Sequence, residues 1–123
     1  MILVDTSVWV DHLRAGNDGL AALLARGEVL GHPFVMGELA LGNLRRRDAV
    51  LSDLRDLPQA VVASDEEVLY FIDHQMLFGR GIGYADAHLL TAARRTGRAK
   101  LWTRDRCLQA VAVALGLAAI LLP

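Results

Sequence analysis

Four carboxylic acids stand at positions where an acid is unusual, and together they suggest a site for a divalent metal ion. Asp5 directly follows the apolar run 1–4, which is typical of a strand buried on both faces. Glu38 and Asp86 fall on the apolar stripes of predicted helices, and Asp105 comes just after another predicted strand. In open α/β sheets, ligands bind at the carboxyl ends of the strands. We therefore expect Asp5, Glu38, Asp86 and Asp105 to converge there.

Converging carboxylates repel one another and resist ionisation unless a cation is present. Neither Glu38 nor Asp86 has a lysine or arginine within four positions to neutralise it. Hard cations prefer oxygen ligands, and no cysteine or histidine pair has zinc spacing, so Mg²⁺ or Mn²⁺ is the expected ion. The purely structural alternative is that each carboxylate has its own hydrogen-bonding partner, either because it caps a helix or because it pairs with an arginine.

Charge is divided unevenly along the chain, although the formal net charge is only −1. Residues 1–79 hold 6 arginines and 12 acids (net −6), whereas residues 80–123 hold 7 basic residues and 2 acids (net +5). A basic half of this kind suits contacts with nucleic-acid phosphates, although a merely solvated face has the same composition. The candidate RNA-binding residues are Arg45, Arg46, Arg47, Arg80, Arg94, Arg95, Arg98 and Arg104.

The elements that must position these residues alternate between strands and helices. Predicted strands cover 1–4, 29–30, 60–62, 100–103 and 118–122, and predicted helices cover 7–15, 18–26, 33–44, a segment ending at 54, 64–79, 84–96 and 104–115. We expect Thr6 or Ser7 to cap the first helix, and Ser64 with Glu67 to form a capping box. The alternation predicts an α/β fold in one domain, 1–123, with a parallel sheet between helices.

Composition limits the cellular setting. Hydrophobic residues make up 54% of the chain and mean hydropathy is +0.33, so we expect some apolar surface to meet a partner. The opening residues lack the basic start of a signal peptide, and the uncharged tail 110–123 is short of the roughly 20 residues of a membrane span. The lone Cys107, expected in the core, fits a reducing cytoplasm. Trp9 is also expected in the core, and the four histidines receive no role.

Short motifs in a fixed order give the chain a family resemblance. They are Val-Asp-Thr-Ser at 4–7, Glu-Leu at 38–39, Tyr-Ala-Asp-Ala at 84–87 and Thr-Arg-Asp at 103–105. In this order and length the chain resembles a PIN-domain protein, specifically a VapC-type ribonuclease toxin of a toxin–antitoxin pair. One departure is Cys107-Leu108, where relatives often carry an aromatic residue.

The resemblance implies more than the residues alone. It implies a five-stranded parallel sheet, a homodimer, and a VapB-like antitoxin whose C-terminal segment covers the acidic site. It implies an endoribonuclease whose Mg²⁺ or Mn²⁺ is held by Asp5, Asp86, Glu38 and Asp105. The hydroxyls of Thr6 and Thr103 would assist around the ion.

Two other classes of protein share the length and the alternation. A receiver domain carries paired acids after its first strand and a lysine after its last active-site strand, whereas Asp5 stands alone and Lys100 precedes its strand. A haloacid-dehalogenase-like phosphatase needs an aspartate at position 7, where Ser7 stands. A non-catalytic Mg²⁺-binding regulatory domain remains the alternative function.

Overall fold

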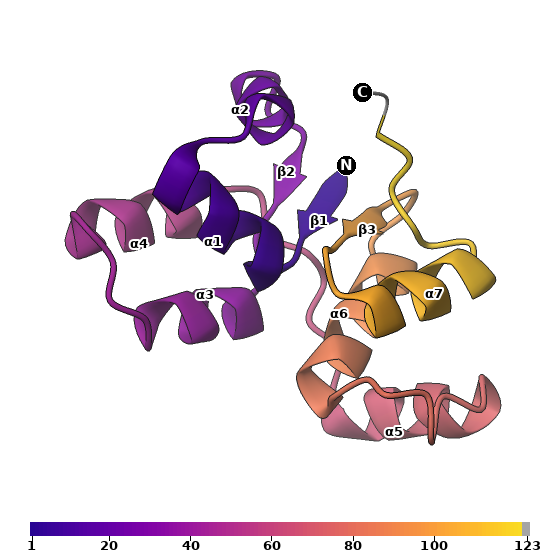
Figure 1. Ribbon diagram of the computed structural model, residues 1–123. Coiled ribbons are helices and arrows are strands. Elements are labelled where there is room, and N and C mark those ends of the chain that lie inside the picture. Colours follow the sequence, from indigo (N-terminus) through magenta and orange to yellow (C-terminus); the bar gives the residue numbers. More distant parts are fainter. Residues whose placement is uncertain (122–123) are drawn as a thin grey trace.

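A short parallel sheet stands at the centre of the fold, with helices packed around it (Figure 1). The computed structural model describes residues 1–121, and within them the strands pair in the order β2-β1-β3. The strands are β1 (Ile2–Val4), β2 (Val29–Leu30) and β3 (Lys100–Trp102), and the helices are α1 (Thr6–Ala15), α2 (Asp18–Ala25), α3 (Pro33–Ala40), α4 (Arg47–Asp56), α5 (Asp65–His74), α6 (Tyr84–Arg95) and α7 (Arg106–Ala114). Helices α1 to α4 gather on one side of the sheet and α5 to α7 on the other. The predicted α/β fold with a parallel sheet is confirmed.

The middle strand β1 is apolar throughout because both of its faces are covered. Leu3 and Val4 have no exposed surface, and Leu3 lies opposite Leu30 on one neighbour and Leu101 on the other. Helix α6 is the most buried helix, with every residue from 87 to 93 in the core. Asp86 therefore lies in the first turn of α6, immediately before seven consecutive buried residues.

The two outer strands that the sequence predicts are reduced to single bridges, between Gly31 and Gln59 and between Leu101 and Ala118. Pairing at the first bridge does not continue, because the chain after Gly31 enters α3 at Pro33, which has no N–H to donate to the carbonyl of Ala60. The parallel order extends to five segments, but only three of them form strands within residues 1–121. Residue 122 of the last predicted strand lies outside the described residues.

Several helix boundaries differ from the predicted ones. Helix α3 ends at Ala40 rather than at 44, since the N–H of Gly42 turns back to the carbonyl of Leu39. Helix α5 ends at His74, and Met76 adopts a left-handed φ of 53° that carries its side chain into solvent while Leu77 is buried. The helix predicted over 64–79 therefore ends five residues early.

Two core predictions have opposite outcomes. Trp9 is buried, as expected. Cys107 is exposed, because the buried stripe of α7 runs through Leu108, Val111 and Ala112 and leaves Cys107 on the outer face. Within residues 1–121, no helix combines the length and apolarity needed to cross a membrane.

Candidate active site

Asp5 is the most heavily bonded of the four predicted acids. It is 7% exposed and caps α1 itself, since its Oδ1 accepts the N–H of Thr6 at 2.8 Å. The predicted cap, Thr6 or Ser7, is thus wrong by one position. Asp5 Oδ2 accepts hydrogen bonds from two hydroxyl groups, Ser7 Oγ at 2.9 Å and Thr103 Oγ1 at 2.7 Å. These neutral donors compensate the buried carboxylate, which has no arginine or lysine partner among the ion pairs of residues 1–121.

Two hydroxyl side chains connect Asp5 to the end of β3. Thr103 is buried, and its Oγ1 also accepts the N–H of Asp105 at 3.1 Å. Ser7 Oγ accepts the N–H of Arg104 at 3.0 Å. Ser7 was not predicted as a site residue; its only signal is its place in the first turn of the helix that follows Asp5.

Glu38 joins the site through Thr6 rather than through the core. Thr6 Oγ1 donates to Glu38 Oε1 at 2.9 Å, which connects α1 to α3. The prediction that Glu38 lies on a buried stripe is wrong: Val35 and Leu39 are the buried residues of α3, and Glu38 is exposed beside them. The apolar neighbours of Glu38 in the sequence predicted the helix correctly, but they did not predict that the Glu38 side chain points away from the core.

Asp86 and Asp105 complete the set. Asp86 is half-buried and accepts the N–H of Gly83 at 3.0 Å, whereas Asp105 is exposed and caps α7 by accepting the N–H of Leu108 at 2.9 Å. Burial raises the pKa of the Asp86 carboxyl, and the charges of Asp5, Asp105 and Glu38 raise it further, partly offset by the Gly83 hydrogen bond. Asp5 and Asp105, which follow β1 and β3 by one and three residues, and Glu38 of α3 thus each lie within electrostatic range of Asp86.

The donor set suits a divalent cation, although it is not drawn together into a closed ligand shell. Within residues 1–121, no three His, Cys, Asp or Glu side chains are close enough to form such a shell. The charges of Asp5, Asp105 and Glu38 nevertheless add to the effect of burial in raising the pKa of Asp86, because like charges oppose its ionisation. Oxygen donors and uncompensated negative charge are what Mg²⁺ and Mn²⁺ require, so the residues fit such an ion.

A buried histidine beside Asp86 was missed. His88 is buried in α6, and its Nε2 lies 3.1 Å from Asp65 Oδ1, which also accepts the Tyr84 hydroxyl at 2.7 Å. The Tyr84 hydroxyl first, and His88 second, lower the pKa of the Asp65 carboxyl. These contacts hold the first turn of α6, which carries Asp86, against the start of α5. A histidine within an apolar helical run was the available signal.

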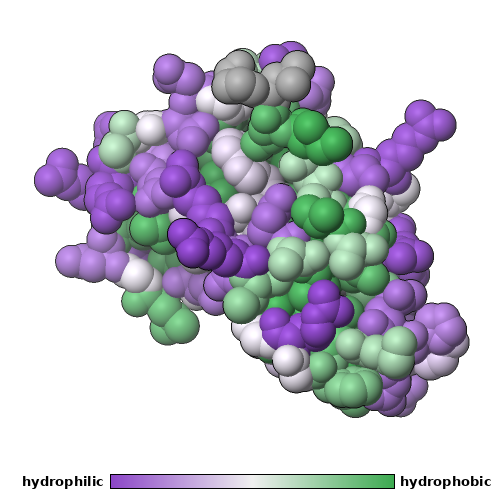
Figure 2. Space-filling model, turned by 45° about the vertical axis from the view of Figure 1, so that its right-hand side comes forward, coloured by the Kyte–Doolittle hydropathy of each residue, from purple (hydrophilic) through white to green (hydrophobic). Residues whose placement is uncertain are grey.

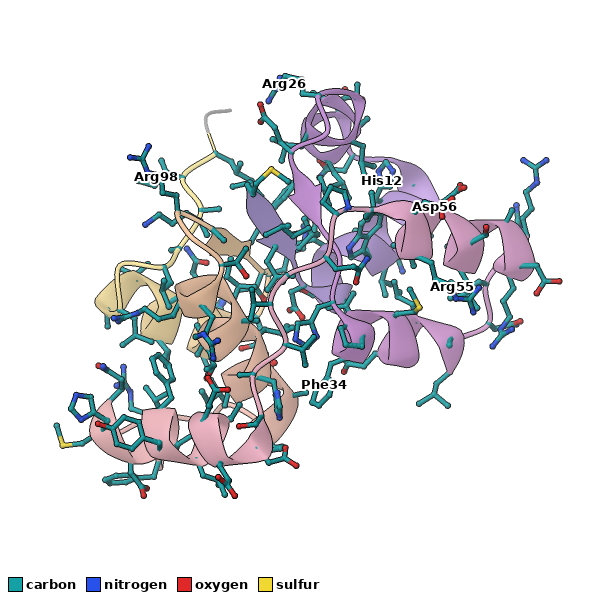
Figure 3. The ribbon with its side chains drawn as sticks, turned by 180° about the vertical axis from the view of Figure 1, so that it is seen from behind. His12, Arg26, Phe34, Arg55, Asp56 and Arg98 are labelled. Atoms are coloured by element: carbon teal, nitrogen blue, oxygen red, sulfur yellow. The ribbon has the colours of Figure 1, made fainter. Side chains whose placement is uncertain are left out.

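The predicted RNA-binding arginines fall into two groups. Arg94 lies over the ring of Phe71 and Arg95 pairs with Glu67, and both follow Asp86 by two turns or more, about 12 Å along α6. Arg98 precedes β3, so it lies at the amino ends of the strands, and Figure 3 shows it far from Phe34 at the start of α3. The second group has contacts closer to the acids: Arg104 donates its N–H to Ser7, Arg45 and Arg46 line a groove together with Glu38, and Arg47 donates to the carbonyl of Ala40. Arg80 is exposed in the loop before α6.

A groove of about 680 Å³ opens beside Glu38, between α1, α3 and the start of α4. Its apolar lining includes Val10, Leu13, Leu44 and Val50. Three guanidinium groups also line it, from Arg14, Arg45 and Arg46. The groove is therefore mainly apolar, with positive charge at its walls and a carboxylate at one end.

Comparisons with known proteins agree with this architecture. The sequence pattern of the PIN domain matches residues 2–114. The chain is 48% identical over 118 residues to Ribonuclease VapC32 of two Mycobacterium tuberculosis strains, CDC 1551 / Oshkosh and ATCC 25618 / H37Rv, covering 96% of this chain and 95% of each relative. The crystal structure of FitAcB from Neisseria gonorrhoeae has the same fold, with a TM-score of 0.60 and 22% identity over 92% of this chain and 94% of that one. The chain belongs to the PIN-domain family and is a relative of the VapC ribonucleases.

Proposed function

We propose that the protein is a Mg²⁺- or Mn²⁺-dependent endoribonuclease and the toxin of a toxin–antitoxin pair. The observation that carries the proposal is the buried Asp5 carboxylate, which follows β1, has no lysine or arginine partner within residues 1–121, and lies near enough to the half-buried Asp86 to help raise its pKa. Carboxylates arranged in this way favour a bound divalent cation. The 48% identity to a protein named Ribonuclease VapC32 supports RNA as the substrate.

Asp5 and Asp86 are the proposed direct ligands, with Glu38 and Asp105 binding directly or through water. Asp5 Oδ2 is held by two hydroxyls, whereas Oδ1 accepts one hydrogen bond within the described residues and so keeps a lone pair for the cation. A bound divalent ion polarises a phosphodiester and lowers the pKa of a coordinated water. One of the four carboxylates accepts the proton of the attacking water. Thr103 and Thr6 orient Asp5 and Glu38.

The apolar groove beside Glu38 supports a protein antitoxin as partner. A peptide with apolar side chains would fill the space between Val10, Leu13 and Val50, and its carboxylates would meet Arg14 and Arg45. Such a peptide ends at the acidic site, because Glu38 belongs to both. We propose that a VapB-like segment binds here and covers the site.

Exposed apolar side chains on another face support a homodimer. Figure 2 shows hydrophobic side chains gathered along the side of the molecule that α7 and the end of the described chain occupy. Val113 of α7 and Ile120 near the end of the described chain are 60% and 90% exposed, which is unusual for large apolar side chains in a monomer. A second copy would remove this surface from water. We place the protein in the cytoplasm, where its RNA substrate is found.

Cleavage of a mixed RNA pool tests the proposal. Purified protein, free of antitoxin, is incubated with EDTA, Mg²⁺ or Mn²⁺ beside the variants Asp5→Asn and Asp53→Asn. Asp53 is an exposed acid on α4 and serves as the matched control. We expect cleavage that requires metal, is lost in Asp5→Asn and persists in Asp53→Asn. Metal binding without any cleavage would instead favour the non-catalytic regulatory domain.

A further inference from the structure

One carboxylate outside the acidic cluster holds two arginines from different parts of the chain. Asp11, on α1, lies with Oδ1 3.1 Å from Nη2 of Arg14 and with Oδ2 2.9 Å from Nε of Arg104. Arg14 follows one turn later on the same helix, whereas Arg104 arrives from the loop between β3 and α7. Asp11 is thus a second point, beyond Ser7, at which that loop contacts α1.

Arg104 is fixed to the acidic cluster at its main chain. It stands between Thr103, which donates to Asp5, and Asp105, and its own N–H donates to Ser7 Oγ at 3.0 Å. From there its side chain extends along α1 to Asp11, six residues and about 9 Å beyond Asp5. The guanidinium group therefore lies at the rim of the site, in an orientation that Asp11 determines.

The free donors of Arg104 are suited to a phosphate. A guanidinium has five N–H donors in a planar fork, and the Asp11 pair engages it at Nε. No other side-chain partner of this guanidinium occurs within residues 1–121, and the side chain is 54% exposed. Its two Nη groups are thus available for bidentate binding of phosphate oxygens. Arg14 adds a second positive charge in the direction of the groove.

We propose that Asp11 is a positioning residue, which holds Arg104 where it binds a backbone phosphate of RNA lying across the acidic cluster. This inference rests on the proposed ribonuclease function and assigns the substrate contact of that same site. Arg104 touches the substrate; Asp11 acts through Arg104.

The direction in which Asp11→Asn changes RNA affinity distinguishes a positioning role from a simple effect of charge. By charge alone, Asp11→Asn removes a negative group near the RNA and strengthens binding. If Asp11 orients Arg104, the same substitution weakens binding, because the guanidinium loses its fixed direction. We expect RNA affinity about three- to tenfold lower in Asp11→Asn, and about tenfold or more lower in Arg104→Gln, as is usual for loss of a charge-assisted hydrogen bond.

The experiment measures fluorescence anisotropy of a labelled mixed-sequence RNA oligonucleotide, in EDTA to prevent cleavage and over a range of salt concentrations. The variants are Asp11→Asn, Arg104→Gln, their combination and Asp11→Glu. The control is Glu28→Gln, which removes the acid of another exposed ion pair, with Arg26, at the amino end of β2. Circular dichroism confirms that each variant is folded.

The expected pattern is specific. Asp11→Asn weakens binding in the wild-type background but has no further effect in Arg104→Gln, and Asp11→Glu restores most of the affinity. Arg104→Gln lowers the slope of log affinity against log salt by about one. In Mn²⁺-dependent cleavage, Asp11→Asn raises KM and leaves kcat nearly unchanged.

Two results would overturn the inference, and they differ in what they mean. Equal or tighter RNA binding by Asp11→Asn, in a protein that still cleaves RNA, refutes the role of Asp11 and leaves the ribonuclease standing. If the wild-type protein neither binds nor cleaves RNA, the proposed function is refuted together with this inference.

Discussion

Thr103→Val removes one hydroxyl and almost no volume, so it isolates the hydrogen bonds that support Asp5. Thr103 is 6% exposed, and its Oγ1 donates to Asp5 Oδ2 at 2.7 Å while accepting the N–H of Asp105 at 3.1 Å. A hydrogen bond to a charged group contributes about 1.5–3 kcal/mol to stability. Because Ser7 still donates to the same oxygen, we expect a loss of about 2 kcal/mol.

For a chain of this size, such a loss lowers the melting temperature by about 8 °C. The second hydroxyl supplies a sharper test. Ser7→Ala alone leaves Thr103 on Asp5 Oδ2, and Thr103→Val alone leaves Ser7, but the double variant leaves that buried oxygen with neither donor. We therefore expect the double variant to lose about 1–2 kcal/mol more than the two single losses combined.

The assay is urea unfolding in EDTA, followed by circular dichroism, for the wild type, both single variants, the double variant and Thr103→Ser. Thr103→Ser keeps the hydroxyl and is expected to remain within about 1 kcal/mol of the wild type. Strict additivity of the two losses, or a change below about 0.5 kcal/mol in Thr103→Val, would refute the argument that these hydroxyls stabilise Asp5.

Two further predictions concern titrating groups. Because the pKa of Asp86 is raised in the folded protein, its ionised form destabilises the fold above that pKa, and this cost disappears as pH falls. We therefore expect Asp86→Asn to have a higher melting temperature than the wild type in EDTA at neutral pH, and to lose RNA cleavage. A lower melting temperature would contradict this. Burial first, and the His88 charge second, lower the pKa of His32 from 6.5 to about 4, so its contribution to the free energy of unfolding is complete above pH 6.5 and is lost as pH falls towards 4. His32→Asn keeps an acceptor for the Phe34 N–H, and we expect it to reduce the pH dependence of the free energy of unfolding, measured in urea, between pH 4 and 6.5. The same pH dependence in the variant and the wild type would contradict this assignment.

Local patterns were sufficient where burial and secondary structure coincide. The uninterrupted apolar run before Asp5 identified β1 because a strand covered on both faces has no reason to alternate. The helix from 84 to 96 was found within one residue of its observed end, since its core stripe and first-turn acid both mark it. The capping box of Ser64 and Glu67 is confirmed by both of its hydrogen bonds.

Local patterns failed where a side chain lies at the border of a stripe. Glu38 and Cys107 each stand next to a buried leucine, and a helical wheel cannot decide which of two adjacent positions faces the core. The helix predicted over 64–79 ends early for another reason, because Met76 adopts a left-handed φ of 53° that interrupts the helical periodicity. The predicted strand 60–62 is reduced to a bridge because the chain beside it enters α3 at Pro33, which has no N–H to donate.

The four acids could be proposed from the residues, and the hydroxyls of Thr6 and Thr103 from the family resemblance, but the hydrogen bond between Thr103 and Asp5 could not, since 98 positions separate the two residues. The register of the sheet explains their meeting. Val4 lies opposite Trp102 in the parallel pair β1·β3, so the residues that follow, Asp5 and Thr103, emerge side by side at the same edge. Once that register is known, the hydroxyl on Asp5 and the attachment of Arg104 to Ser7 both follow from the next one or two residues. The site is thus a consequence of strand pairing, which a linear motif marks without revealing its partners.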